Sequence, residues 1–362
     1  MQGVPNLLYA DKIEIKTATK SNRSLIEHAF ILSAGRSGST LLSNLLNGHT
    51  QILSVPESVF LILIGIKFRH KSGFTEKDYK AIVANLWLRK SELKGAWNQN
   101  NEELLKVLSL RKPQSLAELF NCIYLSYNGV GSKPNPKVVV DKNPMYTKHL
   151  KVIERYYPNS KKIILVRDYR DRYVSIRNNQ PYKYIPAGII RGIVWSKRNK
   201  VLHTYYTKYS DSCMIVKYER LITDTDQVLS EVCSFLGLEF QPTMKDFRLH
   251  FKHDYSPSNI SLNEQEFLQD MHHLSSQPIT DERIGIWKNE EIETIEKLEL
   301  YCAKTGMKFG YQPSLQISKY KKSVIRIKLL PNLVKGVVLS AIRKISFYLP
   351  FRLQKFLVNH FR

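Results

Sequence analysis

A group of small, hydroxyl-bearing and basic side chains stands between an apolar run and a helical pattern early in the chain. The apolar run covers residues 29–33, and leucines at helical spacing begin at Leu41. The residues between them that could hold an anion are Gly35, Arg36, Ser37, Gly38, Ser39 and Thr40. A loop that joins a strand to a helix directs backbone N–H groups and the helix N-terminus at one point, which suits an anion. These residues predict a phosphate or sulfate site; a simple turn of small residues is the alternative.

The spacing of this loop differs from the Gly-x4-Gly-Lys-Ser/Thr motif that binds nucleoside triphosphates. Two residues separate Gly35 from Gly38, and Ser39 stands where that motif has lysine. The sequence therefore argues against a site for magnesium and a triphosphate.

A second basic segment, residues 161–177, also runs from a predicted strand into a predicted helix. Arg167 ends the strand, and Ser175 follows eight residues later. A guanidinium can bind a phosphate through two hydrogen bonds, and a serine hydroxyl can add another. Asp168 and Asp171 offer the alternative of a helix start held by ion pairs, and the segment alone does not separate these two interpretations.

Strand and helix patterns alternate along the chain and predict how these groups are positioned. The predicted strands are rich in Val and Ile and cover residues 29–33, 51–55, 137–140, 161–166 and 214–217. The helical patterns between them cover residues 146–156, 170–178, 189–206 and 225–236. The alternation predicts an α/β fold, a three-layer sandwich around a central parallel sheet. Gly35, Glu57, Lys142 and Arg167 each follow a predicted strand, so we expect them at the carboxyl-terminal edge of the sheet, where such folds bind ligands.

Two segments interrupt this alternation. Residues 75–127 have a polar helical pattern, and we expect them to form a helical cap over the sheet edge. Residues 247–281 are rich in loop-forming residues and contain His250, His253, His272 and His273. The irregular spacing of these histidines, without cysteine partners, predicts a loop rather than a metal site.

The cysteines and the apolar runs indicate the compartment. The four cysteines are widely spaced without a Cys-x-x-Cys pair, which favours a reducing compartment over a disulfide framework or a zinc site. The N-terminus lacks a basic region followed by an apolar core, and the strongest apolar run, residues 59–66, is too short to span a bilayer. These features predict a cytoplasmic protein without a signal peptide or transmembrane segment.

Together, the two anion-binding segments resemble those of the sulfotransferases that use 3′-phosphoadenosine 5′-phosphosulfate (PAPS). In that family, a Gly/Ser/Thr loop cradles the 5′-phosphosulfate, as residues 35–40 would, and an arginine and a serine eight residues apart hold the 3′-phosphate, as Arg167 and Ser175 would. Residues 216–221, 234–238 and 283–288 also resemble family segments in order, so that the resemblance covers about residues 28–305. It implies a P-loop NTPase-like fold, a base contact for Tyr218, and a place for Arg283 in the loop that closes over the nucleotide.

The resemblance also implies the roles of the groups that act in sulfuryl transfer. Glu57 resembles the catalytic glutamate of the carbohydrate and tyrosyl-protein sulfotransferases, which are closest in pattern to this chain. His49 is the alternative base, and for it we expect a structural role in a turn. Lys142 resembles the family lysine that contacts the oxygen bridging phosphate and sulfate, with a surface ion pair to Asp141 as the alternative, and Arg36 would assist from the loop. No metal is expected.

The expected function is transfer of a sulfuryl group from PAPS to a hydroxyl of a carbohydrate or glycolipid, with 3′-phosphoadenosine 5′-phosphate (PAP) as the other product. A protein tyrosine is the alternative acceptor. A P-loop kinase and a non-catalytic protein that binds polyanions or membranes are the alternatives from other classes.

The end of the chain differs in composition from the rest. The chain has a formal net charge of +23, and its residues 300–362 contain 13 Lys and Arg but no Asp or Glu. We therefore divide it into a sulfotransferase domain, residues 1–312, and a basic amphipathic tail, residues 313–362. Apolar residues on one helical side of the tail are Val334, Val337, Val338, Ala341, Ile342 and Ile345. Residues 319–362 have the pattern of helices that lie on anionic membranes, and packing against the domain is the alternative. Nucleic-acid binding is not expected, because no aromatic platform or recognised fold supports it.

Overall fold

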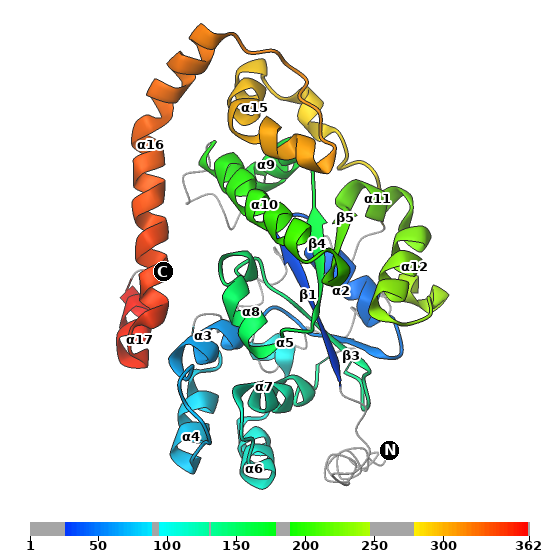
Figure 1. The fold of residues 1–362 in the computed structure, drawn as a ribbon, viewed down its shortest axis with the longest axis vertical. Helices are drawn as coiled ribbons and strands as arrows, with labels where there is room; N and C mark the ends of the chain where they lie inside the picture. The colour runs from blue at the N-terminus through cyan, green and yellow to red at the C-terminus, as the bar shows by residue number, and fades with distance from the viewer. Residues whose placement is uncertain (1–25, 89–93, 130–131, 179–188, 247–278, 361–362) are drawn as a thin grey trace, which may run out of the picture.

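The computed structural model describes residues 26–88, 94–129, 132–178, 189–246 and 279–360. Five parallel strands form one sheet in the order β2-β3-β1-β4-β5 (Figure 1). Their bounds are β1 Glu27–Ser33, β2 Ile52–Ser54, β3 Val138–Lys142, β4 Lys161–Val166 and β5 Cys213–Lys217. Each of the five predicted strands is confirmed. The three central strands are buried almost throughout, which explains their continuous apolar sequences.

Helices surround this sheet. The α-helices are α2 Ser39–Asn47, α3 Phe60–Lys67, α4 Glu76–Asn85, α5 Lys94–Trp97, α6 Asn101–Arg111, α7 Leu116–Leu125, α8 Leu150–Tyr156, α9 Tyr169–Arg177, α10 Ile190–Lys208, α11 Tyr218–Thr223, α12 Thr225–Leu236, α15 Ile292–Gly306, α16 Lys319–Ile345 and α17 Phe351–His360. Short 3-10 helices are η2 Tyr146–Lys148, η4 Ser210–Ser212, η5 Pro242–Asp246, η8 Ile286–Asn289, η9 Met307–Phe309 and η10 Ser346–Tyr348. The segment predicted as one helix over residues 146–156 is thus two, η2 and α8, which meet at His149.

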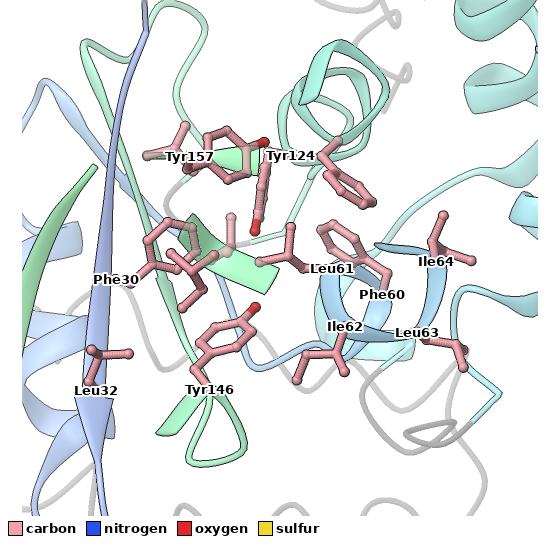
Figure 2. Packing of buried hydrophobic residues seen from close by; sticks show 14 of the residues in the cluster. Phe30, Leu32, Phe60, Leu61, Ile62, Leu63, Ile64, Tyr124, Tyr146 and Tyr157 are labelled. Atoms are coloured by element: carbon pink, nitrogen blue, oxygen red, sulfur yellow. The ribbon is translucent and has the colours of Figure 1, made fainter. Parts of the chain in front are cut away.

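The sheet separates two hydrophobic clusters, because successive side chains of a strand point to opposite faces. On one face, Phe30 and Leu32 of β1 pack with α3 and with rings such as Tyr146 and Tyr157 (Figure 2). On the other face, Ile31 packs with the leucines of α2 and the apolar side of α12. The result is the three-layer α/β arrangement expected from the sequence.

The insertion at residues 75–127 is helical, as predicted, and carries more buried side chains than its polar pattern indicated. Trp97 of α5 and Tyr124 of α7 are completely buried. Tyr124 lies against the face of the sheet, where its ring is 5.6 Å from that of His28. That the insertion at residues 75–127 caps a bound acceptor stays a prediction.

The tail forms one long helix, α16, followed by η10 and α17 (Figure 1). The helix continues through Pro331, although the missing N–H of proline removes one hydrogen bond from the helix. Among the described residues, we find no helix with the length and apolar character needed to cross a membrane.

Candidate functional site

The loop between β1 and α2 is curled by three residues in left-handed backbone conformation. Their φ angles are +82° for Gly35, +55° for Arg36 and +88° for Gly38. Gly38 is also the N-cap residue of α2, and no side chain caps that helix start within the described part of the chain. Because the first N–H groups of a helix lack partners within it, the loop offers several backbone donors at one place, as an anion requires.

Two arginines from helices distant in sequence bind the backbone carbonyl groups of this loop. Arg172 of α9 donates to the carbonyl oxygen of Gly35 at 2.7 Å and to that of Ala34 at 3.0 Å. Arg198 of α10 donates to the same Ala34 oxygen at 2.8 Å. The loop carbonyls thus bind guanidinium groups, and the loop conformation is fixed by contacts that the sequence pattern did not predict.

Lys142, at the end of β3, joins the loop to Glu57. Its Nζ lies 2.8 Å from Oγ1 of Thr40, the second residue of α2, and 3.4 Å from Oε1 of Glu57, which follows β2. The ammonium is almost completely buried, with 3% of the residue exposed. Three segments far apart in sequence therefore bring a carboxylate, an ammonium and a hydroxyl together, at the edge of the sheet where they were expected.

Asp141 points away from Lys142, because adjacent residues of a strand face opposite sides. Its Oδ2 accepts hydrogen bonds from the hydroxyl groups of Tyr124, at 2.6 Å, and Tyr146. Burial raises the pKa of Asp141 to about 7, with the tyrosine hydrogen bonds opposing the shift and the charge of Glu57 adding to it. The structure thus shows Lys142 beside Glu57 rather than in a surface pair with Asp141.

The backbone around Glu57 is held by two side chains. The indole Nε1 of Trp97 donates to the carbonyl oxygen of Glu57 at 3.4 Å, and Nδ2 of Asn143 donates to that of Ser58 at 2.5 Å. These contacts keep the Glu57 side chain close to Lys142.

His49 has the turn role expected for it. Its Nδ1 accepts a hydrogen bond from the Gln51 N–H at 3.0 Å, so Nε2 carries the proton and donates to the Glu239 carbonyl oxygen at 2.9 Å. Burial lowers the pKa of the His49 ring. With both ring nitrogens bonded to backbone groups, His49 is poorly suited to act as a base.

Arg167 and Tyr218 form a stack next to the loop. The guanidinium carbon of Arg167 lies 4.3 Å from the centre of the Tyr218 ring. The same ring lies against Gly38, since a Cβ placed on Gly38 would be only 2.5 Å from Cδ2 of Tyr218. Arg167 forms no ion pair with any described residue, and its Nη2 donates to the backbone carbonyl of Arg283 at 2.7 Å. Ser175 is half-buried in the second turn of α9.

The segment 283–290 is attached to α9 by Asp171. The carboxylate accepts hydrogen bonds from the N–H groups of Gly285, at 2.8 Å, and Trp287, at 3.1 Å. Arg170, which pairs with Asp168 at 2.7 Å, stacks on the Trp287 ring at 4.0 Å. The ion-pair alternative for this helix start therefore holds for Asp168, whereas Asp171 binds backbone.

No cluster of three His, Cys, Asp or Glu residues is placed to hold a metal ion in the described part of the chain. The four histidines His250, His253, His272 and His273 lie outside it.

Comparisons with known proteins identify the family of the chain. Residues 29–242 match the model of the Sulfotransferase family. Protein-tyrosine sulfotransferase 2 of Gallus gallus is 21% identical over 293 residues, covering 78% of this chain and 69% of that protein. A Caenorhabditis briggsae protein provisionally named as a protein-tyrosine sulfotransferase is 28% identical over 134 residues, 35% of this chain. That match spans 45% of the relative's length, so the chain covers less than half of it.

Solved structures resemble the fold. A sulfotransferase domain from the curacin biosynthetic pathway has a TM-score of 0.52 and 21% identity, over 80% of this chain and 99% of that domain. At that identity the likeness supports the α/β fold with its parallel sheet.

Proposed function

Because this chain belongs to the sulfotransferase family, we propose that it transfers a sulfuryl group from PAPS to an acceptor hydroxyl, first of all that of a carbohydrate or glycolipid. The observation that carries the proposal is the position of Lys142, between Thr40 of the anion-binding loop and Glu57. A donor bound by the loop would have its reacting end beside both a cation and a carboxylate.

In the proposed reaction, Glu57 accepts the proton of the acceptor hydroxyl. The acceptor oxygen forms a bond to sulfur while the bond from sulfur to the phosphate oxygen breaks, and the electron pair stays on that oxygen of the PAP product. Lys142, Arg36 and the loop N–H groups stabilise the charge that develops there.

The rest of the donor would bind along the loop towards β4 and β5. Arg167 and Ser175 are proposed to bind the 3′-phosphate, and Tyr218 to contact the adenine. Two features support this: Arg167 is buried without a carboxylate partner among the described residues, and it touches both Tyr218 and the segment that contains Arg283. A 3′-phosphate would supply an anionic partner in direct contact with the guanidinium.

Nucleotide binding is tested by thermal stabilisation with PAP, compared with ADP and with ATP plus magnesium. A ligand at about a hundred times its dissociation constant adds about 2.7 kcal/mol of stability. We expect PAP to stabilise the protein, ADP to do so less, and Arg167→Ala to remove the difference. Arg220→Ala is the control, because Arg220 pairs with Glu231 on the surface. Stabilisation by ATP and magnesium alone would support a kinase instead, and no response to any nucleotide would support a non-catalytic binding protein.

A protein tyrosine is the second candidate acceptor, favoured by the names of the Gallus gallus and Caenorhabditis relatives. Transfer of labelled sulfate from PAPS would be measured for a glycolipid, for a soluble oligosaccharide and for an acidic peptide containing tyrosine. Sulfation of the peptide alone would replace the carbohydrate proposal. In either case Glu57→Gln should abolish transfer and leave PAP binding intact.

A further inference from the structure

Helix α16 exposes a row of aliphatic side chains along one side. Their spacing of three or four positions places them on one helical face, and between 51% and 72% of each residue is exposed. These residues, which we call the aliphatic row, are Ile327, Leu330, Val334, Val338, Ile342 and Ile345. The row extends over 18 residue steps, or about 27 Å at the α-helical rise. Exposed apolar surface of this extent and regularity indicates an interaction site.

The row faces away from the protein because the opposite side of α16 packs on the domain. Ile325 is 5% exposed, and Leu329 packs against the main hydrophobic cluster. Each stands two positions from Ile327, or about 200° around the helix. The alternative that the apolar side of the tail packs against the domain therefore does not apply to the aliphatic row.

Both ends of the tail are attached to the domain. Near the start of α16, Nζ of Lys321 lies 2.6 Å from a carboxylate oxygen of Glu296. At the other end, Phe347 of η10 is buried with its ring centre 5.3 Å from that of His149, and the ring of Phe351 lies 6.4 Å from that of Phe68. The helix is thus held along the outside of the molecule (Figure 1).

The charge around the row identifies its partner. Residues 313–362 contain 11 Lys and Arg and no Asp or Glu. Arg326, Lys328 and Lys344 are exposed and lie beside the row, about 100° from it on one side or the other. Basic groups that flank an aliphatic face match an anionic lipid surface, into which the aliphatic groups insert while the cations remain at the headgroups. A second copy of the chain would bring two strongly positive tails together, which disfavours a dimer through this face.

We propose that α16 binds the enzyme to the surface of an anionic lipid bilayer through the aliphatic row and its flanking cations. The exposed Tyr320 extends the row at its start, and tyrosine is favoured at the boundary between lipid and water. This proposal does not depend on the identity of the acceptor.

The test is co-sedimentation of the full chain with vesicles. Vesicles of phosphatidylcholine with phosphatidylserine are compared with vesicles of phosphatidylcholine alone. We expect binding to the anionic vesicles to be at least about tenfold tighter and to weaken at high salt, because each cation near the surface contributes. Failure of the full chain to bind anionic vesicles would overturn the proposal, as would equal binding to both kinds.

Two sets of variants locate the binding surface. Val334→Gln, Val338→Gln and Ile342→Gln together should weaken binding about tenfold or more, because these apolar groups would no longer enter the lipid. The matched control replaces three exposed aliphatic residues elsewhere, Leu110→Gln, Val201→Gln and Ile292→Gln, and should bind like the wild type.

The second set removes charge. Replacing Arg326, Lys328 and Lys344 with alanine should weaken binding more than replacing Arg220, Lys245 and Lys297, which pair with carboxylates on the surface. Equal losses would mean that net charge alone attracts the protein, and would overturn the assignment to α16. Because the substituted residues are exposed, or in the case of Lys297 partly exposed, thermal unfolding should change little. Sedimentation velocity should give a monomer, and a dimer that dissociates in the glutamine variant would assign the row to a second copy instead.

Discussion

Replacing Gly38 with alanine should disturb the proposed nucleotide site through a single new methyl group. The Cβ would lie 2.5 Å from Cδ2 and 2.9 Å from Cε2 of Tyr218. Carbon atoms in contact are normally about 3.5–4.0 Å apart, so the ring would have to move by about 1 Å. Tyr218 is buried and stacked on Arg167, so the ring cannot move without disturbing that contact.

The expected loss of stability follows from three contributions. A left-handed conformation costs an alanine about 1–2 kcal/mol, and the lower entropy of the unfolded chain offsets about 0.4–1 kcal/mol of that. Overpacking of a buried contact adds about 1–3 kcal/mol. Gly73 supplies the matched control, because it has φ +69° and a Cβ there would meet no atom within 4 Å. Gly73→Ala should therefore show the net backbone cost alone, about 0–1.6 kcal/mol.

Chemical unfolding measures the stability of both variants, and calorimetric titration measures their affinity for PAP. We expect Gly38→Ala to be less stable than Gly73→Ala by about 1–3 kcal/mol. PAP affinity should fall at least about tenfold in Gly38→Ala only, since a loss of 1.4 kcal/mol suffices. If the two variants are equally stable and bind PAP like the wild type, Tyr218 does not lie against the loop and its proposed contact with the nucleotide is wrong.

Three further predictions concern the remaining parts of the molecule. Lys142→Ala should lower turnover by about 10²–10³-fold while the affinity for PAP changes little, because in the proposed reaction the ammonium acts on charge that develops during transfer. Asp171→Asn should weaken PAP binding about tenfold, because its amide group would replace one acceptor oxygen that holds the segment 283–290. Burial lowers the pKa of His149 from 6.5 to about 4 in the folded protein, so its contribution to stability is complete above pH 6.5 and is lost as the pH falls towards 4. In chemical unfolding, His149→Gln should reduce this loss, which is at most about 3 kcal/mol.

Each of these predictions has a control and a contrary outcome. Lys297→Ala is the control, because it removes a partly exposed lysine that pairs with Glu293. Equal losses of turnover and affinity in Lys142→Ala would make Lys142 a simple binding residue. Asp226→Asn breaks a surface ion pair and should leave PAP binding unchanged. If Asp171→Asn also leaves the affinity for PAP unchanged, the segment 283–290 does not contribute to PAP binding. His70→Gln is the control, because His70 is exposed. If the stability of His149→Gln depends on pH in the same way as that of His70→Gln, charging the buried His149 ring does not destabilise the protein.

The fold was predictable because its strands are short apolar runs buried on both faces, and such runs can be recognised in the sequence alone. The meeting of Glu57, Lys142 and Thr40 was predictable for a related reason: parallel strands all end at the same edge. The contacts that hold the loop of residues 35–40 in place were not predictable. Arg172 and Arg198 bind carbonyl oxygens of residues more than a hundred positions away, and no local pattern marks an arginine for that task.

In the tail, the local rule that proline ends a helix does not hold. Pro331 suggests a division of the tail, yet α16 runs through it. The proline deprives the carbonyl group of Ile327 of its partner in the helix. Ile327 is 72% exposed, so water can bind that oxygen. The helix α16 can therefore continue through Pro331 without leaving that carbonyl oxygen unpaired.

The order of the strands has a consequence for how such an enzyme could change during evolution. Glu57 follows β2 and Arg167 follows β4, and two strands, β3 and β1, separate them. Neighbouring strands are about 4.8 Å apart, so the two ends of the proposed site are about 14 Å from each other along the sheet edge. One half of the edge would then recognise the donor while the other half meets the acceptor. Substitutions around β2 and the helical insertion could redirect the enzyme to a new acceptor without loss of its donor, which would let one inherited scaffold diversify.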